Sequence, residues 1–277
     1  MTKVWNQAPL PFVGQKRFFL QLFKESLKQI PDDGAGWVIV DVFGGSGLLA
    51  HTAKRNKPAA RVIYNDFDGY AERLNNIPDY NRLLAEIQQL TKDVSRESRL
   101  PQDVEAAVKS AIRSFDGAID VRVLSSWLLF STKQAIDIEQ LLGWEFYNKV
   151  RKTPFNPCDG YLDGLEIVSE DYENLMRRYQ DGENILFVLD PPYVGTEQFA
   201  YKSDKYFNMV AFLKLIHLTR PPFILFGSTR SEICEYLDYL KECEPPAWSK
   251  FAGAQIHKLP AKMAKGVSYE DNMVVKF

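Results

Sequence analysis

A glycine-rich loop between two short apolar segments limits the folds open to this chain more than any other feature of its 277 residues. Residues 37–42 are apolar and β-branched, residues 48–55 have the composition of a helix, and residues 61–66 return to a strand pattern. Strand, loop, helix and strand in this order are typical of a parallel βαβ unit. The sequence therefore predicts an α/β domain.

The loop itself, from Asp41 to Gly47, has the composition of a cofactor-binding turn. Its glycines let the backbone turn sharply and let a ligand approach the main chain, although a tight turn without a ligand has the same pattern. No Lys-Ser or Lys-Thr pair follows the glycines, so the loop does not predict an ATP site. Asp66 ends the next strand about 20 residues later, where an acid binds ribose hydroxyls. Asp68 is the competing residue, and a turn or helix-cap role is the alternative for both.

A second motif, Asp190-Pro191-Pro192-Tyr193, follows the apolar segment 185–189. Ligands of open α/β sheets bind at the carboxyl ends of strands, and two prolines hold a rigid bend without donating hydrogen bonds. We therefore expect the Asp190 carboxylate and the Pro191 carbonyl to accept both hydrogens of an aromatic amine, which would localise its lone pair for attack on a methyl sulfonium. Tyr193 offers a face on which an extruded base could stack. The alternative is a proline-rich loop with Tyr193 in the core.

The placement of cysteines narrows this chemistry further. The chain has three cysteines, which lie far apart and form no CxxC pair, so we expect no disulfide framework and no metal site. None lies near the 190–193 motif, whereas methylation of cytosine carbon 5 requires a thiolate nucleophile. The motif therefore predicts transfer to an amino nitrogen.

The composition is that of a globular protein, with 45% hydrophobic and 25% charged residues. The formal net charge of −2 means that DNA binding would depend on a local basic face. No apolar run approaches the ~20 residues of a membrane helix, and the N-terminus has no signal-peptide pattern. We therefore expect a cytoplasmic protein without a membrane partner.

Between the two motifs the sequence changes character. Residues 76–165 are rich in helix formers and charge, with an amphipathic helix predicted over 101–115 and irregular structure over 144–165. Strand and helix patterns then alternate again, with strands at 185–189, 223–226 and 273–277 and helices at 209–219 and 231–241. We expect a catalytic domain of residues 1–75 and 167–277, interrupted by a mostly helical target-recognition domain of residues 76–166.

With these motifs in this order, the chain resembles DNA adenine N6-methyltransferases of the Dam type, the alpha group. The resemblance implies a Rossmann-like sheet that binds S-adenosylmethionine and methylates N6 of an adenine flipped out of double-stranded DNA. It covers residues 9–70 and 167–230. In the stretch between them, the family's Leu-Asn-Arg and Phe-Asn-Gly segments are absent, so the resemblance implies no particular target sequence.

The same resemblance implies the site residues. The N-terminal segment PFVGQK matches a family motif whose aromatic and lysine lie at the cofactor and target pocket, and a Tyr stands where the family has the Phe that contacts the cofactor's adenine. The residues matched to cofactor positions are Phe12, Lys16, Asp41, Phe43, Gly45, Gly47, Asp66, Asp171, Tyr172 and Asp190. The residues matched to the catalytic motif are Asp190, Pro191, Pro192 and Tyr193.

Basic residues among aromatic ones are the candidate DNA contacts. Lys149, Arg151 and Lys152 lie in a segment that combines basic, aromatic and amide groups, which suits contact with phosphates and bases. Lys202, just after the catalytic motif, would hold the flipped nucleotide. A solvated surface is the simpler explanation for any single lysine.

Two other functions stay open. Methylation of cytosine N4 would use the same acceptors, and a catalytically inactive homologue would bind DNA on the same scaffold. RNA is a further possible substrate, whereas methylation of a protein amide goes with Asn rather than Asp at position 190. A cognate restriction enzyme is a candidate partner, and the sequence indicates no oligomeric state.

Overall fold

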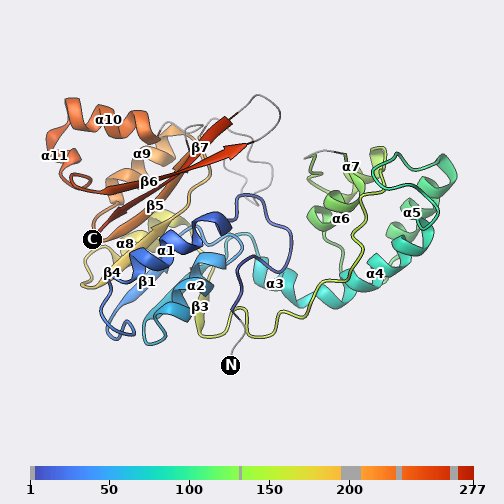
Figure 1. The fold of residues 1–277 in the computed structure, drawn as a ribbon, viewed down its shortest axis with the longest axis horizontal. Helices are drawn as coiled ribbons and strands as arrows, with labels where there is room; N and C mark the ends of the chain where they lie inside the picture. The colour runs from blue at the N-terminus through green and yellow to red at the C-terminus, as the bar shows by residue number, and fades with distance from the viewer. Residues whose placement is uncertain (1–3, 131–132, 195–206, 229–232, 263–267) are drawn as a thin grey trace. The chain divides into compact units, whose positions relative to one another are not determined.

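The computed structural model of the chain describes residues 4–130, 133–194, 207–228, 233–262 and 268–277. The chain divides into two compact units. The first, which we call the sheet unit, contains residues 1–7, 15–68 and 160–277, and the second, the helical unit, contains residues 8–14 and 69–159. Each unit is described by itself (Figure 1).

The strands of the sheet unit form one seven-stranded sheet in the order β3-β2-β1-β4-β5-β7-β6. The first five of these are parallel to one another, and β7 is antiparallel to both β5 and β6. The strands are β1 (Val38–Asp41), β2 (Arg61–Asn65), β3 (Leu165–Val168), β4 (Ile185–Leu189), β5 (Phe223–Ser228), β6 (Gln255–Lys262) and β7 (Ser268–Lys276). This arrangement confirms the predicted mixed α/β, Rossmann-like fold.

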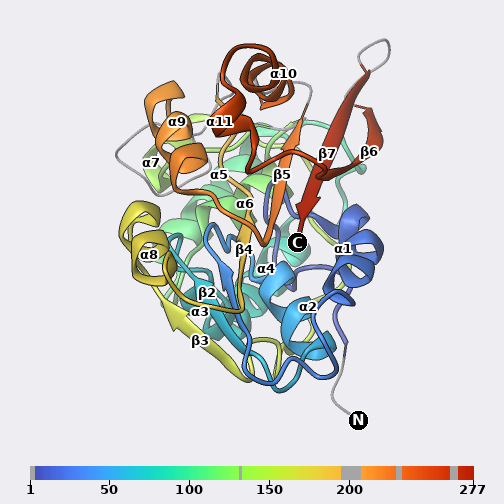
Figure 2. The same ribbon diagram turned by 90° about the vertical axis from the view of Figure 1, so that its left-hand side faces the viewer.

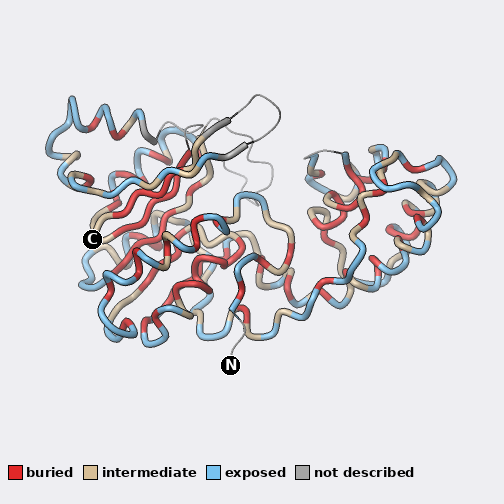
Figure 3. Tube along the Cα trace, in the orientation of Figure 1, coloured by how far each residue is buried: buried red, intermediate tan, exposed pale blue. Residues whose placement is uncertain are grey.

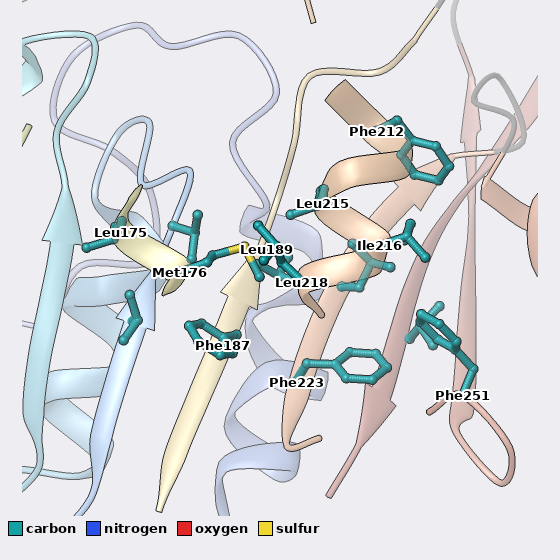
Figure 4. Packing of buried hydrophobic residues seen from close by; sticks show 14 of the residues in the cluster. Leu175, Met176, Phe187, Leu189, Phe212, Leu215, Ile216, Leu218, Phe223 and Phe251 are labelled. Carbon is teal, nitrogen blue, oxygen red and sulfur yellow. The ribbon is translucent and has the colours of Figure 1, made fainter. Parts of the chain in front are cut away.

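Helices cover both faces of this sheet (Figure 2). The helices of the unit are η1 (Arg17–Phe19), α1 (Leu20–Leu27), α2 (Leu48–Asn56), α8 (Tyr172–Tyr179), α9 (Met209–Leu218), α10 (Ile233–Cys243) and α11 (Pro245–Trp248). Side chains of α1 and α2 pack with Leu186 and Val188 of β4. On the other face, side chains of α8, α9 and α10 pack with Phe187 and Leu189, and Figure 4 shows part of this cluster. Figure 3 shows the central strands of the sheet as buried. Both faces of β4 are buried, which explains its unbroken apolar sequence.

The order of the strands places the two sequence motifs side by side. From the neighbouring strands β1 and β4 the chain continues outward in opposite directions, to β2 and to β5, which makes this pair the topological switch point where open α/β sheets bind ligands. Asp41 of β1 is in register with Val188 of β4. The glycine loop and the 190–193 motif therefore leave the sheet at adjacent positions on its carboxyl edge.

The carboxyl-terminal hairpin differs from the prediction of a single strand at 273–277. In the structure this strand is β7 (Ser268–Lys276), which begins five residues earlier than predicted and pairs with all eight residues of β6. β6 lies at the edge of the sheet, its sequence QIHKLPAK has no regular apolar alternation, and it contains Pro260, which sheets tolerate at edges. A polar edge strand of this kind has little signal for a sequence-based prediction.

The helical unit consists of helices joined by irregular segments. Its helices are α3 (Tyr70–Asn75), α4 (Ile77–Leu90), α5 (Gln102–Ser114), α6 (Val121–Leu128) and α7 (Ile138–Gly143). The Asp120 side chain accepts hydrogen bonds from the Arg122 and Val123 amides, which caps α6, and forms an ion pair with Arg73. The segment 8–14 belongs to this unit because the Leu10 amide donates to the Tyr70 hydroxyl at 2.9 Å. Among the described residues no helix is long and apolar enough to cross a membrane.

Candidate active site

The 190–193 motif is held by contacts on two sides. Lys16 Nζ lies 2.7 Å from Asp190 Oδ1 and faces the ring of Tyr193, 5.5 Å from its centroid. The ring of Phe226 lies on the same ammonium at 5.9 Å. The Tyr193 hydroxyl donates to the Gly227 carbonyl at 3.3 Å, which ties the motif to β5. The carboxylate and the aromatic ring that the sequence singled out are thus fixed beside one buried lysine.

Asp41, at the end of β1, is a second buried carboxyl group near the first. Its Oδ2 accepts a hydrogen bond from the Ala50 amide at 3.1 Å, but its Oδ1 is buried without a hydrogen-bond partner among the described residues. Burial and the nearby Asp190 charge raise the pKa of Asp41 to about 8, against the Ala50 hydrogen bond. Burial also raises the pKa of Asp190, although Lys16 opposes that shift. A cationic ligand next to Asp41 would favour its ionised form and lower its pKa.

The glycine loop is packed against Tyr64 of β2. A Cβ at Gly44 would lie 2.3 Å from the Tyr64 ring, so no larger residue fits without moving the loop. Gly47 has φ of 71°, a conformation that glycine adopts without strain. The Tyr64 hydroxyl donates to the Gly45 carbonyl at 2.8 Å and lies 3.1 Å from Asp66 Oδ1. Tyr64 therefore holds the loop and the candidate ribose-binding acid together.

An aromatic cluster lies beside the loop. Phe43 stacks on Tyr172 with 5.5 Å between ring centroids, and Phe207 meets both rings edge-on at 5.8 Å. The Tyr172 hydroxyl donates to the Ala211 carbonyl at 2.9 Å. Asp171 is exposed, and its Oδ1 accepts from the Glu173 amide at 2.9 Å, which caps α8. Tyr172 thus presents a ring beside Phe43, whereas the contact that the structure shows for Asp171 is a helix cap.

A buried network behind the loop was not predicted from the sequence. The Tyr161 hydroxyl donates to the Ser46 carbonyl at 2.9 Å, and its ring stacks on His51 at 4.9 Å. The Trp5 amide donates to His51 Nε2 at 3.2 Å, so the ring proton is on Nδ1, which donates to the Tyr161 carbonyl at 2.6 Å. Tyr161 lies in an irregular stretch 115 residues from Ser46. No local pattern in the sequence could have connected them.

The structure brings most of the predicted residues to one region, at the carboxyl ends of β1 to β4. These are Lys16, Asp41, Phe43, Gly45, Gly47, Asp66, Tyr172, Asp190, Pro191, Pro192 and Tyr193. Phe12 is in the helical unit, where its ring meets Tyr70 edge-on at 5.7 Å. Lys149, Arg151 and Lys152 are also in the helical unit. Lys202 lies outside the described residues.

Comparison with known proteins gives two findings. A family model described as D12 class N6 adenine-specific DNA methyltransferase matches residues 12–214, a range that includes the glycine loop and the 190–193 motif. A protein of Haemophilus influenzae named "Putative methyltransferase" is 47% identical over 277 residues, which cover 99% of this chain and 94% of that protein.

Proposed function

The chain belongs to the D12 class of N6 adenine-specific DNA methyltransferases, and we propose that it transfers the methyl group of S-adenosylmethionine to N6 of an adenine in double-stranded DNA. The observation that carries this proposal is the pairing of Asp41 with Val188, which sets the glycine loop beside the 190–193 motif at the switch point of the sheet. A cofactor site and an amine-binding corner then share one edge.

The residues at this edge fit a cationic cofactor. The buried Asp41 Oδ1 has no hydrogen-bond partner among the described residues, and an unpaired buried carboxylate is costly. Asp41 is mostly protonated at neutral pH without a ligand, because its pKa is about 8, and it would ionise on binding and pair with the sulfonium and ammonium groups of S-adenosylmethionine. In this proposal Asp41 and the glycine loop hold the amino-acid part of the cofactor, Asp66 binds its ribose, and the stacked pair of Phe43 and Tyr172 lies beside its adenine. When bound, the cofactor supplies an electrophilic methyl group on sulfur.

Asp190 and Pro191 would prepare the target nitrogen. The Asp190 carboxylate and the Pro191 carbonyl accept the two amino hydrogens, which localises the lone pair on nitrogen for formation of the N–CH₃ bond. Lys16 favours the ionised form of Asp190 by lowering the pKa that burial raises. The ring of Tyr193, tied to Gly227, offers a stacking surface for the extruded base. After the N–CH₃ bond has formed, the Asp190 carboxylate accepts the extra proton of the methylated nitrogen.

The family supports adenine rather than cytosine N4 as the target. Every matched position of the catalytic motif has the residue that transfer requires, which supports an active enzyme rather than an inactive homologue. We assign catalysis to the sheet unit and target recognition to the helical unit. A cytoplasmic location and a cognate restriction enzyme stay predictions from the sequence.

The test is the chemical identity of the methylated base. Purified protein is incubated with unmethylated plasmid and S-adenosylmethionine labelled in its methyl group, and the DNA is digested to nucleosides and separated. We expect the label in N6-methyladenine. Label in N4-methylcytosine would support the cytosine alternative, and DNA without label in the presence of intact, cofactor-binding protein would refute the proposal.

A further inference from the structure

The segment Phe146–Arg151 of the helical unit is extended between two neighbouring segments. On one side the amides of Tyr147 and Lys149 donate to the carbonyls of Leu128 and Trp127, at 2.8 and 3.0 Å. On the other side the segment bonds to residues 97–100, with an antiparallel bridge between Arg99 and Tyr147. It therefore behaves as a short strand at the end of α6.

Side chains along this segment alternate between the interior and the surface. Phe146, Asn148 and Val150 are buried, whereas Tyr147, Lys149 and Arg151 are half-buried. Successive side chains of an extended segment point to opposite faces. The half-buried three therefore share one face, which carries one aromatic ring followed by two cations.

Phe130 extends this face at its aromatic end. Its side chain is 56% exposed, and its ring lies 5.2 Å from the ring of Tyr147 at an angle of 43°. At the other end the Arg151 guanidinium lies 3.9 Å from the centroid of Phe155 and donates to the Thr153 and Pro154 carbonyls, which holds its plane in place. We call Phe130, Tyr147, Lys149 and Arg151 the ridge.

The charges around the ridge favour an anionic partner. Glu145, the acidic residue next to the segment, is paired with Arg99 at 2.7 Å, so its charge is compensated away from the two cations of the ridge. Aromatic side chains stack on bases or wedge between base steps, and Lys and Arg neutralise phosphates. Aromatic and cationic groups in sequence on one face match these two requirements of a nucleic acid.

We propose that the ridge is the surface by which the helical unit binds duplex DNA, with Phe130 and Tyr147 contacting bases and Lys149 and Arg151 contacting phosphates. This rests on the proposed function, because it takes duplex DNA as the substrate. The two ends of the ridge then differ in their response to salt. Phosphate contacts release counterions, whereas contacts of an aromatic ring with bases do not.

The experiment measures binding of a fluorescein-labelled, unmethylated duplex by anisotropy over a series of salt concentrations. We expect Lys149→Ala to reduce the slope of log Kd against log salt by about 0.9, the value for one phosphate contact. Phe130→Ala should weaken binding roughly tenfold at every salt concentration and leave the slope unchanged. Phe130→Trp, which keeps a ring, should retain most of the affinity.

The matched control is Tyr239→Ala, which removes another exposed aromatic that stacks on a neighbour, Tyr236, but lies on α10 of the sheet unit. It should bind like the wild type. Phe130 is exposed, and thermal melting will show that its variants stay folded. Unchanged affinity of Phe130→Ala, or a slope of Lys149→Ala equal to that of the wild type, would overturn the proposal. Failure of the wild type to methylate DNA would instead refute the proposed function.

Discussion

Cofactor affinity should depend on pH through Asp41. The carboxyl group has a pKa of about 8 because it is buried near Asp190, so it is mostly protonated at neutral pH. A cationic cofactor pairs with the carboxylate and not with the neutral acid. Binding must therefore release a proton, and affinity should rise with pH until Asp41 is ionised without the ligand.

The size of this effect follows from the pKa. The fraction of ionised Asp41 grows by nearly tenfold per pH unit well below a pKa of about 8, so the Kd should fall roughly twentyfold between about pH 6 and about pH 7.5. An α-amino group on the ligand stays largely protonated over this range. Asp41→Asn keeps an acceptor for the Ala50 amide but cannot ionise, and should bind weakly with a Kd that does not vary with pH.

Although Asp41→Asn should weaken cofactor binding, it should make the folded protein more stable than the wild type at neutral and higher pH. The Asp41 carboxyl group has a higher pKa in the folded state than in the unfolded state. The folded state therefore loses stability as the pH rises from about 4, the pKa in the unfolded state, to about 8, the pKa in the folded state. Asp41→Asn should therefore raise the free energy of unfolding by a few kcal/mol at the upper end and leave it unchanged at the lower end.

Isothermal titration of S-adenosylmethionine into the protein in buffers of different ionisation enthalpy measures both the Kd and the released proton. Asp238→Asn, on the exposed face of α10, is the matched control and should follow the wild type. A wild-type Kd that is constant over this range, or a pH dependence that survives in Asp41→Asn, would refute the reasoning.

Three further predictions concern the residues around the site. Tyr161→Phe leaves the Ser46 carbonyl without its hydroxyl donor but keeps the stacking on His51. The KM for the cofactor should therefore rise about fivefold to tenfold at unchanged kcat. An unchanged KM would show that this hydrogen bond does not position the glycine loop. Gly44→Ala places a Cβ against the Tyr64 ring and should abolish cofactor binding measured by titration, whereas Gly143→Ala, where a Cβ meets nothing within 4 Å, should not. Lys16→Met removes the ammonium that lowers the pKa of Asp190, so the acidic limb of the pH–kcat profile should move to higher pH, and a limb that stays in place would contradict this role.

Much of the sheet could be predicted because its strands follow simple rules. The segment 185–189 is continuously apolar since both faces of β4 are covered, and its bounds in the structure are those predicted. β6 was missed because it is a polar edge strand with a proline. Prediction from one sequence thus succeeded for strands whose burial requires apolar residues. It failed for the edge strand, where exposure to solvent places no such requirement on the residue types.

For the site, the sequence could indicate the residues that follow strands but not their partners. Asp41 is the last residue of β1, and Asp66 and Asp190 directly follow β2 and β4, positions that the sequence pattern alone indicates. The Lys16–Asp190 ion pair joins residues 174 positions apart and was implied only in general terms by the resemblance. The support of the loop by Tyr161 depends on tertiary packing that no spacing encodes.

The helical unit was the least predictable part. Its helices could be expected from apolar periodicity, and α5 (Gln102–Ser114) lies within the predicted 101–115. The inclusion of residues 8–14 could not be expected, because the bonds of Leu10 and Pro11 to Tyr70 and Arg73 join distant segments. Phe12, matched to a cofactor position by resemblance, therefore belongs to the helical unit.

The most direct test of the account removes the Asp190 carboxylate and follows binding and transfer separately. Asp190→Ala should retain measurable binding of S-adenosylmethionine by titration, while transfer of the labelled methyl group to plasmid adenine falls by at least roughly 100-fold, a loss typical of a group that handles the transferred proton. Asp238→Ala should transfer like the wild type. If Asp190→Ala methylates adenine at a rate close to that of the wild type, the amine is not activated at this corner and the central claim is wrong.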